Sequence, residues 1–224
     1  MNALTEAFVW LNDPLNWTNP GGILDLLGQH LYLSGLSVLL GCVIAWPIGL
    51  WLGHTGRGGA GTVVVANLTR AIPTLALLSL FPLTALGFGT WSVVIPLSVF
   101  AIPPLLATAY TGMRSVDADV RDAATGMGLS PVQVLTRVEF PLAIPQLASG
   151  FRTAAVQVVA TATLAALVNG GGLGVIINRG FGQSIAAGGG LILAGGILVA
   201  LLALIIEGVL ALAEKYVTPR PLRT

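Results

Sequence analysis

The feature that most constrains the fold of this chain is a long run of residues without any charge. Residues 71–113 contain no Asp, Glu, Lys, Arg or His. An α-helix rises about 1.5 Å per residue, so about 20 apolar residues cross a hydrocarbon core of about 30 Å. The run is about twice that length, and Pro82 and the turn at Gly87-Phe88-Gly89 divide it. The sequence therefore predicts two membrane spans here, at about 62–86 and 91–111.

Composition agrees with a membrane protein. Hydrophobic residues make up 55% of the chain, charged residues 8%, and the mean hydropathy is +0.89. A soluble domain carries about 25% charged residues. A net charge of +1 gives no general attraction to nucleic acid. The single cysteine, Cys42, lies in an apolar run, so we expect neither a disulfide nor a metal site.

Three further apolar segments are long enough to span a membrane, at about His30–Gly53, Pro145–Val168 and Leu191–Ala213. The sequence therefore predicts an all-α membrane protein with about five transmembrane helices. Gly49 and Gly53 offer a face for close helix packing in the first span. His30 and His54 bracket that span, and we expect both at the membrane interface.

The remaining segments complete the predicted domain organisation. Residues 1–28 are expected to form an extracytoplasmic or interfacial N-terminal segment, because Trp10 and Trp17 suit a membrane interface. Residues 29–215 form the transmembrane domain, in which Asn169 to Gly190 is expected to be a glycine-rich connection. Residues 216–224 form a basic tail.

The distribution of Lys and Arg predicts the orientation of the chain. Five spans place the two termini on opposite sides, and one side receives all the Lys and Arg residues outside the spans except Arg179. Loops rich in Lys and Arg remain in the cytoplasm. We therefore expect a multi-pass protein of the cell membrane with an outside N-terminus and a cytoplasmic C-terminus, and with residues 117–141 in the cytoplasm.

The segment Asp117–Pro141 carries a high density of charge in an otherwise apolar chain. Its first half predicts a short helix, which Asp117 or Asp119 caps and which Gly128 ends as a C′ glycine. Its second half predicts another helix, with a capping box formed by Ser130 and Gln133 and with Pro131 at the first helical position. We expect Pro141 to stop this second helix.

This segment resembles the EAA signature of the membrane subunits of binding-protein-dependent (type I) ABC importers. The family pattern is Glu-Ala-Ala, three residues, Gly, nine residues, then Ile-x-Leu-Pro. The chain matches that spacing with Asp122-Ala123-Ala124, Gly128 and Val138-Glu139-Phe140-Pro141. The flanking segments Ala71–Leu83, Ala107–Asp117 and Arg152–Gly174 are similar to the glycine betaine/carnitine/choline (osmoprotectant) subgroup.

The resemblance implies a type I permease fold with a cytoplasmic coupling helix-turn-helix, and a permease subunit that is not itself an enzyme. It implies a second permease copy, identical or paralogous, two cytoplasmic ATPase subunits that bind ATP and Mg, and an extracytoplasmic solute-binding protein. No cofactor is expected on this chain, which has no Walker A sequence. The residues expected to couple to the ATPase are Asp122, Ala123, Ala124, Gly128, Ser130, Pro131, Val138 and Pro141.

Charges inside predicted spans are functional candidates, because burying them in a membrane is costly. We expect Glu207 to pair with Arg70 or Arg152 and to stabilise one state of a gate; the alternative is that the charges extend to the interface. Four polar residues of the fourth span and its end are candidates to line the solute pathway, although Thr and Gln also join helices. They are Gln157, Thr161, Thr163 and Asn169.

Other functions remain open at this point. The chain is expected to form the translocation pathway for an osmoprotectant, but a permease for methionine or another small solute has the same signature. A secondary transporter would need inverted repeats and acidic residues at the membrane midplane. A membrane scaffold without transport activity would not need the coupling signature.

Overall fold

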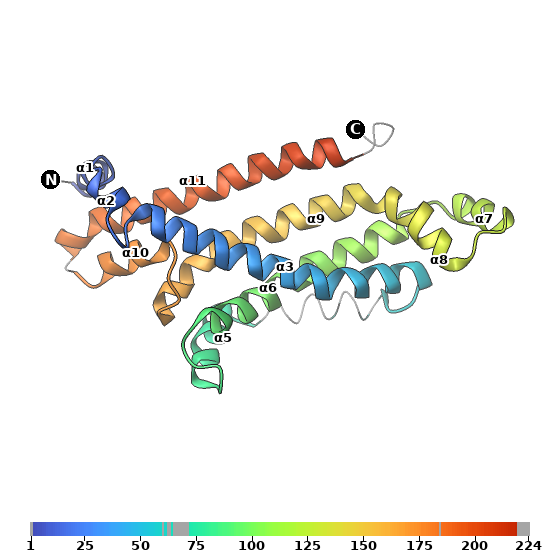
Figure 1. Cartoon of the computed structure of the whole chain (residues 1–224), viewed down its shortest axis with the longest axis horizontal. Coiled ribbons are helices and arrows are strands. Elements are labelled where there is room, and N and C mark those ends of the chain that lie inside the picture. The colour runs from blue at the N-terminus through green and yellow to red at the C-terminus, as the bar shows by residue number, and fades with distance from the viewer. Residues whose placement is uncertain (1, 60, 62–63, 65–71, 184, 219–224) are drawn as a thin grey trace. The chain divides into compact units, whose positions relative to one another are not determined.

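The computed structural model describes residues 2–59, 61, 64, 72–183 and 185–218 (Figure 1). Every regular element in these residues is helical, which confirms the predicted fold class. The elements are α1 (Ala3–Leu11), α2 (Leu15–Thr18), α3 (Ile23–Thr55), α5 (Thr74–Leu80), η1 (Phe81–Leu83), α6 (Thr90–Arg114), α7 (Ala118–Gly126), α8 (Pro131–Val134), η2 (Leu135–Glu139), α9 (Phe140–Thr161), η3 (Ala162–Val168), α10 (Gly174–Phe181) and α11 (Ile185–Val217).

Within the described ranges, four helical segments are long and apolar enough to cross a membrane. They are Leu15–Thr55, Thr90–Arg114, Pro131–Val168 and Gly188–Val217. Each contains most or all of one predicted span, and each is longer than predicted. The fifth predicted span, at 62–86, lies partly outside the described residues; α5 and η1 form its second half.

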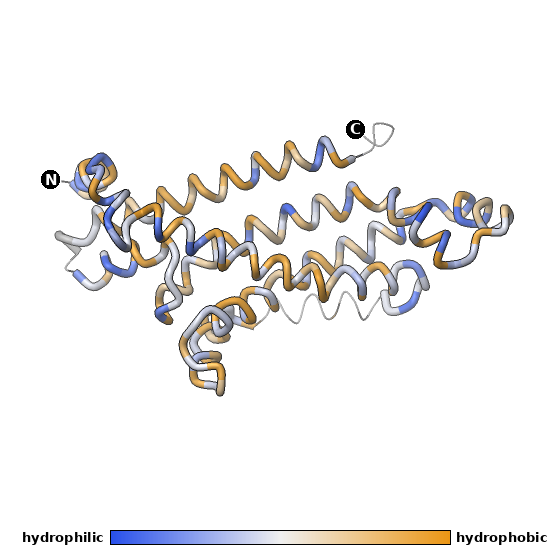
Figure 2. The backbone as a smooth tube through the Cα atoms, viewed as in Figure 1, coloured by the Kyte–Doolittle hydropathy of each residue, from blue (hydrophilic) through white to orange (hydrophobic). Residues whose placement is uncertain are grey.

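Figure 2 shows that these long helices are mostly hydrophobic, whereas hydrophilic residues gather in α7. The chain divides into two compact units. Unit 1 comprises residues 1–38, 73–98 and 155–206, and unit 2 comprises residues 39–72, 99–154 and 207–224.

The core of unit 1 joins the beginning of α3 to residues near the glycine-rich segment. Ile23, Leu26, Val159, Leu173 and Ile176 are buried together. Trp10 and Trp17 pack against this cluster, and the Trp17 indole donates a hydrogen bond to the Leu11 carbonyl at 2.7 Å. The N-terminal segment therefore contains two helices that belong to a core.

His30 is a buried residue of unit 1, so the prediction of an interfacial histidine was wrong. Its side chain is fully buried. Its Nε2 lies 2.9 Å from the Val159 carbonyl oxygen, and its Nδ1 accepts a hydrogen bond from the Leu173 amide at 3.2 Å. The Leu173 amide of the glycine-rich segment thereby gains the hydrogen-bond partner that a buried backbone group needs.

The segment from Asn169 to Gly190 is not a simple connection, because it contains α10 and the beginning of α11. Asn169 has a left-handed backbone (φ 59°) and ends η3. The turn then leads directly into α10. The many glycines favoured the prediction of a loop, but tertiary packing supports helices in this segment.

In unit 2, the end of α3 packs very closely against α6. A Cβ added to Gly49 would lie 2.6 Å from the Ala109 Cβ, and one added to Gly53 would lie 2.5 Å from the Met113 Cβ. Side chains larger than hydrogen do not fit at these distances. The predicted close-packing face at Gly49 and Gly53 is therefore confirmed.

Candidate functional site

The charged segment of unit 2 forms the predicted helix-turn-helix (Figure 1). The side chain of Asp117 accepts a hydrogen bond from the Asp119 amide at 2.9 Å and caps α7. At the other end of α7, Gly128 has φ +84°, a conformation that glycine adopts without strain. The Leu129 amide then donates to the Ala124 carbonyl at 3.3 Å, as in a Schellman motif.

The second helix begins with the predicted capping box. The Gln133 amide donates to Ser130 Oγ at 3.4 Å, and the Ser130 amide donates to Gln133 Oε1 at 2.8 Å. Pro131 is the first residue of α8, where its missing N–H removes no helical hydrogen bond.

Pro141 does not stop this helix, contrary to the prediction. The chain passes from α8 through one π-helical turn, η2, and directly into α9. Pro141 is the second residue of α9, and a proline in the first turn of a helix costs no hydrogen bond of that helix. The Phe140 amide instead bonds to the Leu135 carbonyl, the wider spacing of a π-turn.

The residues of the signature do not all face outward. Ala123 and Asp122 are exposed, whereas Ala124 is buried at 2% exposure, so Ala124 packs within the chain. Gly128, Ser130 and Pro131 are exposed. Val138 and Pro141 are half-buried. The exposed part of the signature therefore lies in α7, the turn and the start of α8.

Apolar side chains are also exposed on this helix-turn-helix. Val120 is 42% exposed, Met127 75% and Val132 66%. They lie beside hydrophilic residues of α7, which Figure 2 shows in blue. Exposed apolar residues surrounded by polar ones are typical of a protein docking surface.

A cluster of ionisable side chains around one buried carboxylate joins this segment to neighbouring helices; we name His54, Arg121 and Glu139 the loop cluster. Glu139, in η2, is 1% exposed. Its Oε2 lies 2.5 Å from Nδ1 of His54, in the last turn of α3. Its Oε1 lies 2.9 Å from Nε of Arg121 in α7, within ion-pair distance although the N–H is not aligned for a hydrogen bond. Arg121 also donates to the Met113 carbonyl in α6.

No pattern in the sequence pointed to this cluster. Glu139 occupies the variable position of the signature, so the pattern gave it no weight. His54 precedes it by 85 residues, and no local pattern connects the two. Arg121 pairs with Glu139 inside the Asp117–Pro141 segment.

A second cluster lies between α9 and α11; we name Arg152, Glu207 and Glu214 the helix cluster. Arg152 Nη1 lies 3.1 Å from Glu207 Oε1, and Arg152 Nε lies 3.2 Å from Glu214 Oε2. The three side chains are between 23% and 43% exposed. Within the described residues, Glu207 therefore pairs with Arg152. Arg70, the other expected partner, lies outside the described residues.

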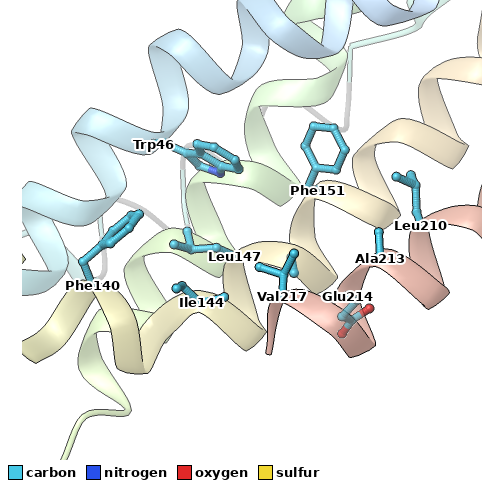
Figure 3. Close-up of a pocket in the computed structure, with 10 residues that line it drawn as sticks. Trp46, Phe140, Ile144, Leu147, Phe151, Leu210, Ala213, Glu214 and Val217 are labelled. Carbon is cyan, nitrogen blue, oxygen red and sulfur yellow. The ribbon is translucent and has the colours of Figure 1, made fainter. Parts of the chain in front are cut away.

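Glu214 was missed, although the sequence holds a signal for it. It follows Glu207 by seven residues, close to two helical turns, so both carboxylates lie on one face of α11. Glu214 also lines a cavity of about 390 Å³ between α9, α11 and α3 (Figure 3). Trp46 and Phe151 face this cavity, with ring centroids 6.2 Å apart.

The four residues expected to line a pathway all lie in unit 1. Gln157 in α9 and Asn169 after η3 are exposed, while Thr161 and Thr163 are half-buried. The Thr163 hydroxyl donates to the Ala160 carbonyl at 2.6 Å. Gln157 and Thr161 share a helix face because they are four residues apart.

Comparison with known proteins identifies the family. Residues 37–218 match the family described as "Binding-protein-dependent transport system inner membrane component". The chain belongs to this family. It is therefore a multi-pass membrane component of a transport system, and the signature segment lies within the matched range.

Named relatives of this permease cover most of the chain. It is 34% identical over 92% of its length to the "Glycine betaine/carnitine/choline transport system permease protein OpuCB" of Bacillus subtilis (strain 168), 93% of which is covered. It is 34% identical over 90% of its length to the "Choline transport system permease protein OpuBB" of the same organism, 91% of which is covered. It is 29% identical over 92% of its length to the "Osmoprotectant import permease protein OsmW" of Salmonella typhimurium, 96% of which is covered.

A solved structure supports the fold. A chain of the MetNI methionine ABC transporter, in an inward-facing conformation, matches with a TM-score of 0.78 at 22% identity. The match covers 93% of this permease and 100% of that chain. At this identity the match establishes the fold of an ABC importer permease.

Proposed function

We propose that this permease forms the translocation pathway of an ATP-driven importer for an osmoprotectant that carries a quaternary ammonium group, such as glycine betaine, carnitine or choline. The observation that carries the proposal is the identity of 34% over 92% of the chain to a glycine betaine/carnitine/choline permease. The methionine alternative is weaker, because the likeness to a methionine transporter is at 22% identity and concerns the fold.

The proposed partners are a second permease copy, identical or paralogous, two ATPase subunits and an extracytoplasmic solute-binding protein, all within a lipid membrane. ATP and Mg bind to the ATPase subunits, and this chain binds no cofactor. The three arginines Arg114, Arg121 and Arg137 support a cytoplasmic location for the helix-turn-helix. The N-terminus is then outside and the C-terminus cytoplasmic.

The helix-turn-helix is the proposed docking element for the ATPase. Its exposed apolar residues supply the buried centre of an interface, and the exposed charges around them supply a polar rim. Met127, at 75% exposure, is the most exposed of these apolar residues. The capping box and the left-handed Gly128 hold the surface in one conformation, which lowers the entropic cost of docking.

The helix cluster is the proposed gate element. Arg152 has two carboxylate partners on α11, so a small shift between α9 and α11 can exchange one for the other. Gln157, Thr161, Thr163 and Asn169 remain the proposed pathway residues of unit 1.

The test is uptake into proteoliposomes that contain the permease and its ATPase, with the loaded binding protein outside the vesicles. We expect accumulation of labelled glycine betaine, carnitine or choline only when ATP is enclosed with the ATPase. Accumulation driven by an ion gradient without ATP would contradict the proposal in favour of a secondary transporter. ATP-dependent uptake of methionine alone would replace the proposed solute class.

Two variants test the docking surface in the same assay. Met127→Asp places a charge in the proposed interface and is expected to reduce co-purification of the ATPase by roughly 10-fold or more. The matched control is Met127→Leu, which keeps an apolar side chain of similar size and is expected to co-purify normally. Equal co-purification of both variants would exclude this surface.

A further inference from the structure

Glu139 has an unusual environment for an acidic residue in this chain. Among the residues that the structure describes, Glu139 is the only Asp, Glu, Lys or Arg that is buried. The other charged residues are at least partly exposed. A buried carboxylate is costly unless it is paired and hydrogen-bonded. An apolar residue in its place, with apolar partners, is often equally stable. Overall stability therefore does not by itself account for an ionic cluster here.

The contacts of Glu139 and of its partner Arg121 join four separate elements of unit 2. Glu139 lies in η2, at the beginning of α9, and contacts His54 in the last turn of α3. It also contacts Arg121 in α7, and Arg121 donates to the Met113 carbonyl in the last turns of α6. The carboxylate thus joins α7 to the end of α3 and the beginning of α9, and Arg121 extends the connection to the end of α6.

The elements that it joins are themselves closely packed. A Cβ at Gly53 would lie 2.5 Å from the Met113 Cβ and 2.9 Å from the Tyr110 carbonyl oxygen, so α3 and α6 lack room to slide at this point. The outer surface of the helix-turn-helix, with Met127 and Val132, is exposed. The segment therefore has a free side and a side that is fixed by ionic contacts.

We propose that Glu139 is a positioning residue for energy coupling, which makes the helix-turn-helix and the ends of α3, α6 and α9 move as one body. This inference rests on the proposed function, in which the ATPase displaces the helix-turn-helix. A displacement of α7 then pulls Arg121, and through the carboxylate of Glu139 it moves α9 and α3 together. Without the carboxylate, α7 moves while the long helices lag behind.

The variant Glu139→Gln tests this directly, since the amide has the shape of the carboxylate but no charge. In proteoliposomes we expect the solute transported per ATP hydrolysed to fall by roughly 2- to 30-fold, the range for changes along a coupling element. Co-purification of the ATPase and its basal ATP hydrolysis should remain. Asp13→Asn is the matched control, because Asp13 is exposed and its contact with the Leu15 amide survives the change.

A double-variant cycle separates positioning from simple structural damage. If His54 acts through Glu139, the variant with both His54→Gln and Glu139→Gln should have the same transport per ATP as the worse single variant. Independent effects that multiply would overturn the proposal. An unchanged ratio in Glu139→Gln, or a loss of transport that only follows a loss of ATPase co-purification, would also overturn it.

Hydrogen exchange on the purified complex distinguishes this inference from the proposed function. We expect Glu139→Gln to increase the exchange of backbone amides in α7 while α10 stays unchanged. If the native complex shows no ATP-driven uptake, the proposed function fails, and the exchange result still decides whether Glu139 fixes the helix-turn-helix. Unchanged exchange in α7 would refute the role of Glu139 in either case.

Discussion

The loop cluster and the helix cluster each contain three ionisable side chains, but they are organised in opposite ways. In the loop cluster, one buried carboxylate, Glu139, serves two nitrogen partners and is 1% exposed. In the helix cluster, one cation, Arg152, serves two carboxylates, and all three side chains are 23–43% exposed. The comparison indicates that the first cluster fixes one arrangement, whereas the second allows partners to exchange.

The largest expected effect comes from removing the buried carboxylate. Glu139→Leu leaves Arg121 near an apolar side chain with its charge uncompensated, which costs about 3–5 kcal/mol in buried pairs. We expect a clear fall in the thermal midpoint of the detergent-solubilised permease, measured by size-exclusion chromatography after heating. Glu139→Gln should lower the midpoint much less. Equal midpoints for Glu139→Leu and the native protein would show that the loop cluster is not a fixed structure.

The second-largest loss of stability is expected where α3 and α6 approach each other closely beside the loop cluster. Gly53→Val forces its side chain against Met113 and the Tyr110 carbonyl, and overpacking of this kind costs about 1–3 kcal/mol. The same heating experiment measures it. Gly35→Val is the control, because an added Cβ at Gly35 meets nothing within 4 Å. Similar losses in the two variants would mean that this contact does not restrain the end of α3.

Variants of Gly128 test whether the turn between α7 and α8 fixes the conformation of the docking surface. A residue with a Cβ in a left-handed conformation costs about 1–2 kcal/mol, so Gly128→Val should weaken ATPase co-purification. Gly128→Asn is the control, since Asn tolerates this conformation. An added Cβ meets no atom within 4 Å, so the Cβ itself causes no steric overlap within this chain. If Val and Asn behave alike, the turn does not require φ +84°.

The helix cluster should give the smallest single effects. Glu207→Gln or Glu214→Gln leaves Arg152 with its other carboxylate, so each is expected to cost about 1 kcal/mol or less, as for exposed pairs. The double variant should cost more than the sum, because Arg152 then has no carboxylate partner in the cluster. Additive losses in the thermal midpoint would show that the two carboxylates do not substitute for each other.

Local features of the fold were predictable from the sequence. The caps at Asp117 and Ser130 and the left-handed Gly128 depend on residues within a few positions, and all three are confirmed. A pairing of Glu207 with either Arg70 or Arg152 was predictable because the apolar spans contain few charges, and the structure gives Arg152 as a partner. These signals do not depend on how distant parts of the chain meet.

Long-range contacts were not predictable in the same way. His30 was expected at the interface, but its partners lie 129 and 143 residues away. Glu139 and His54 are likewise distant in sequence and meet only in the folded chain. Pro141 was expected to end a helix, but the π-turn before it leads directly into α9, which contains Pro141. The coupling, gate and pathway roles of the site residues remain predictions.

The π-turn η2 has a consequence for the direction in which the docking surface faces. A π-turn contains one residue more than an α-helical turn, and each residue rotates a helix by about 100°. Removing one residue between Leu135 and Glu139 would turn the π-turn into an α-helical turn and would rotate α8 relative to α9 by about that angle. The number of residues in this turn, more than their chemical nature, therefore sets which side of α8 faces an incoming partner.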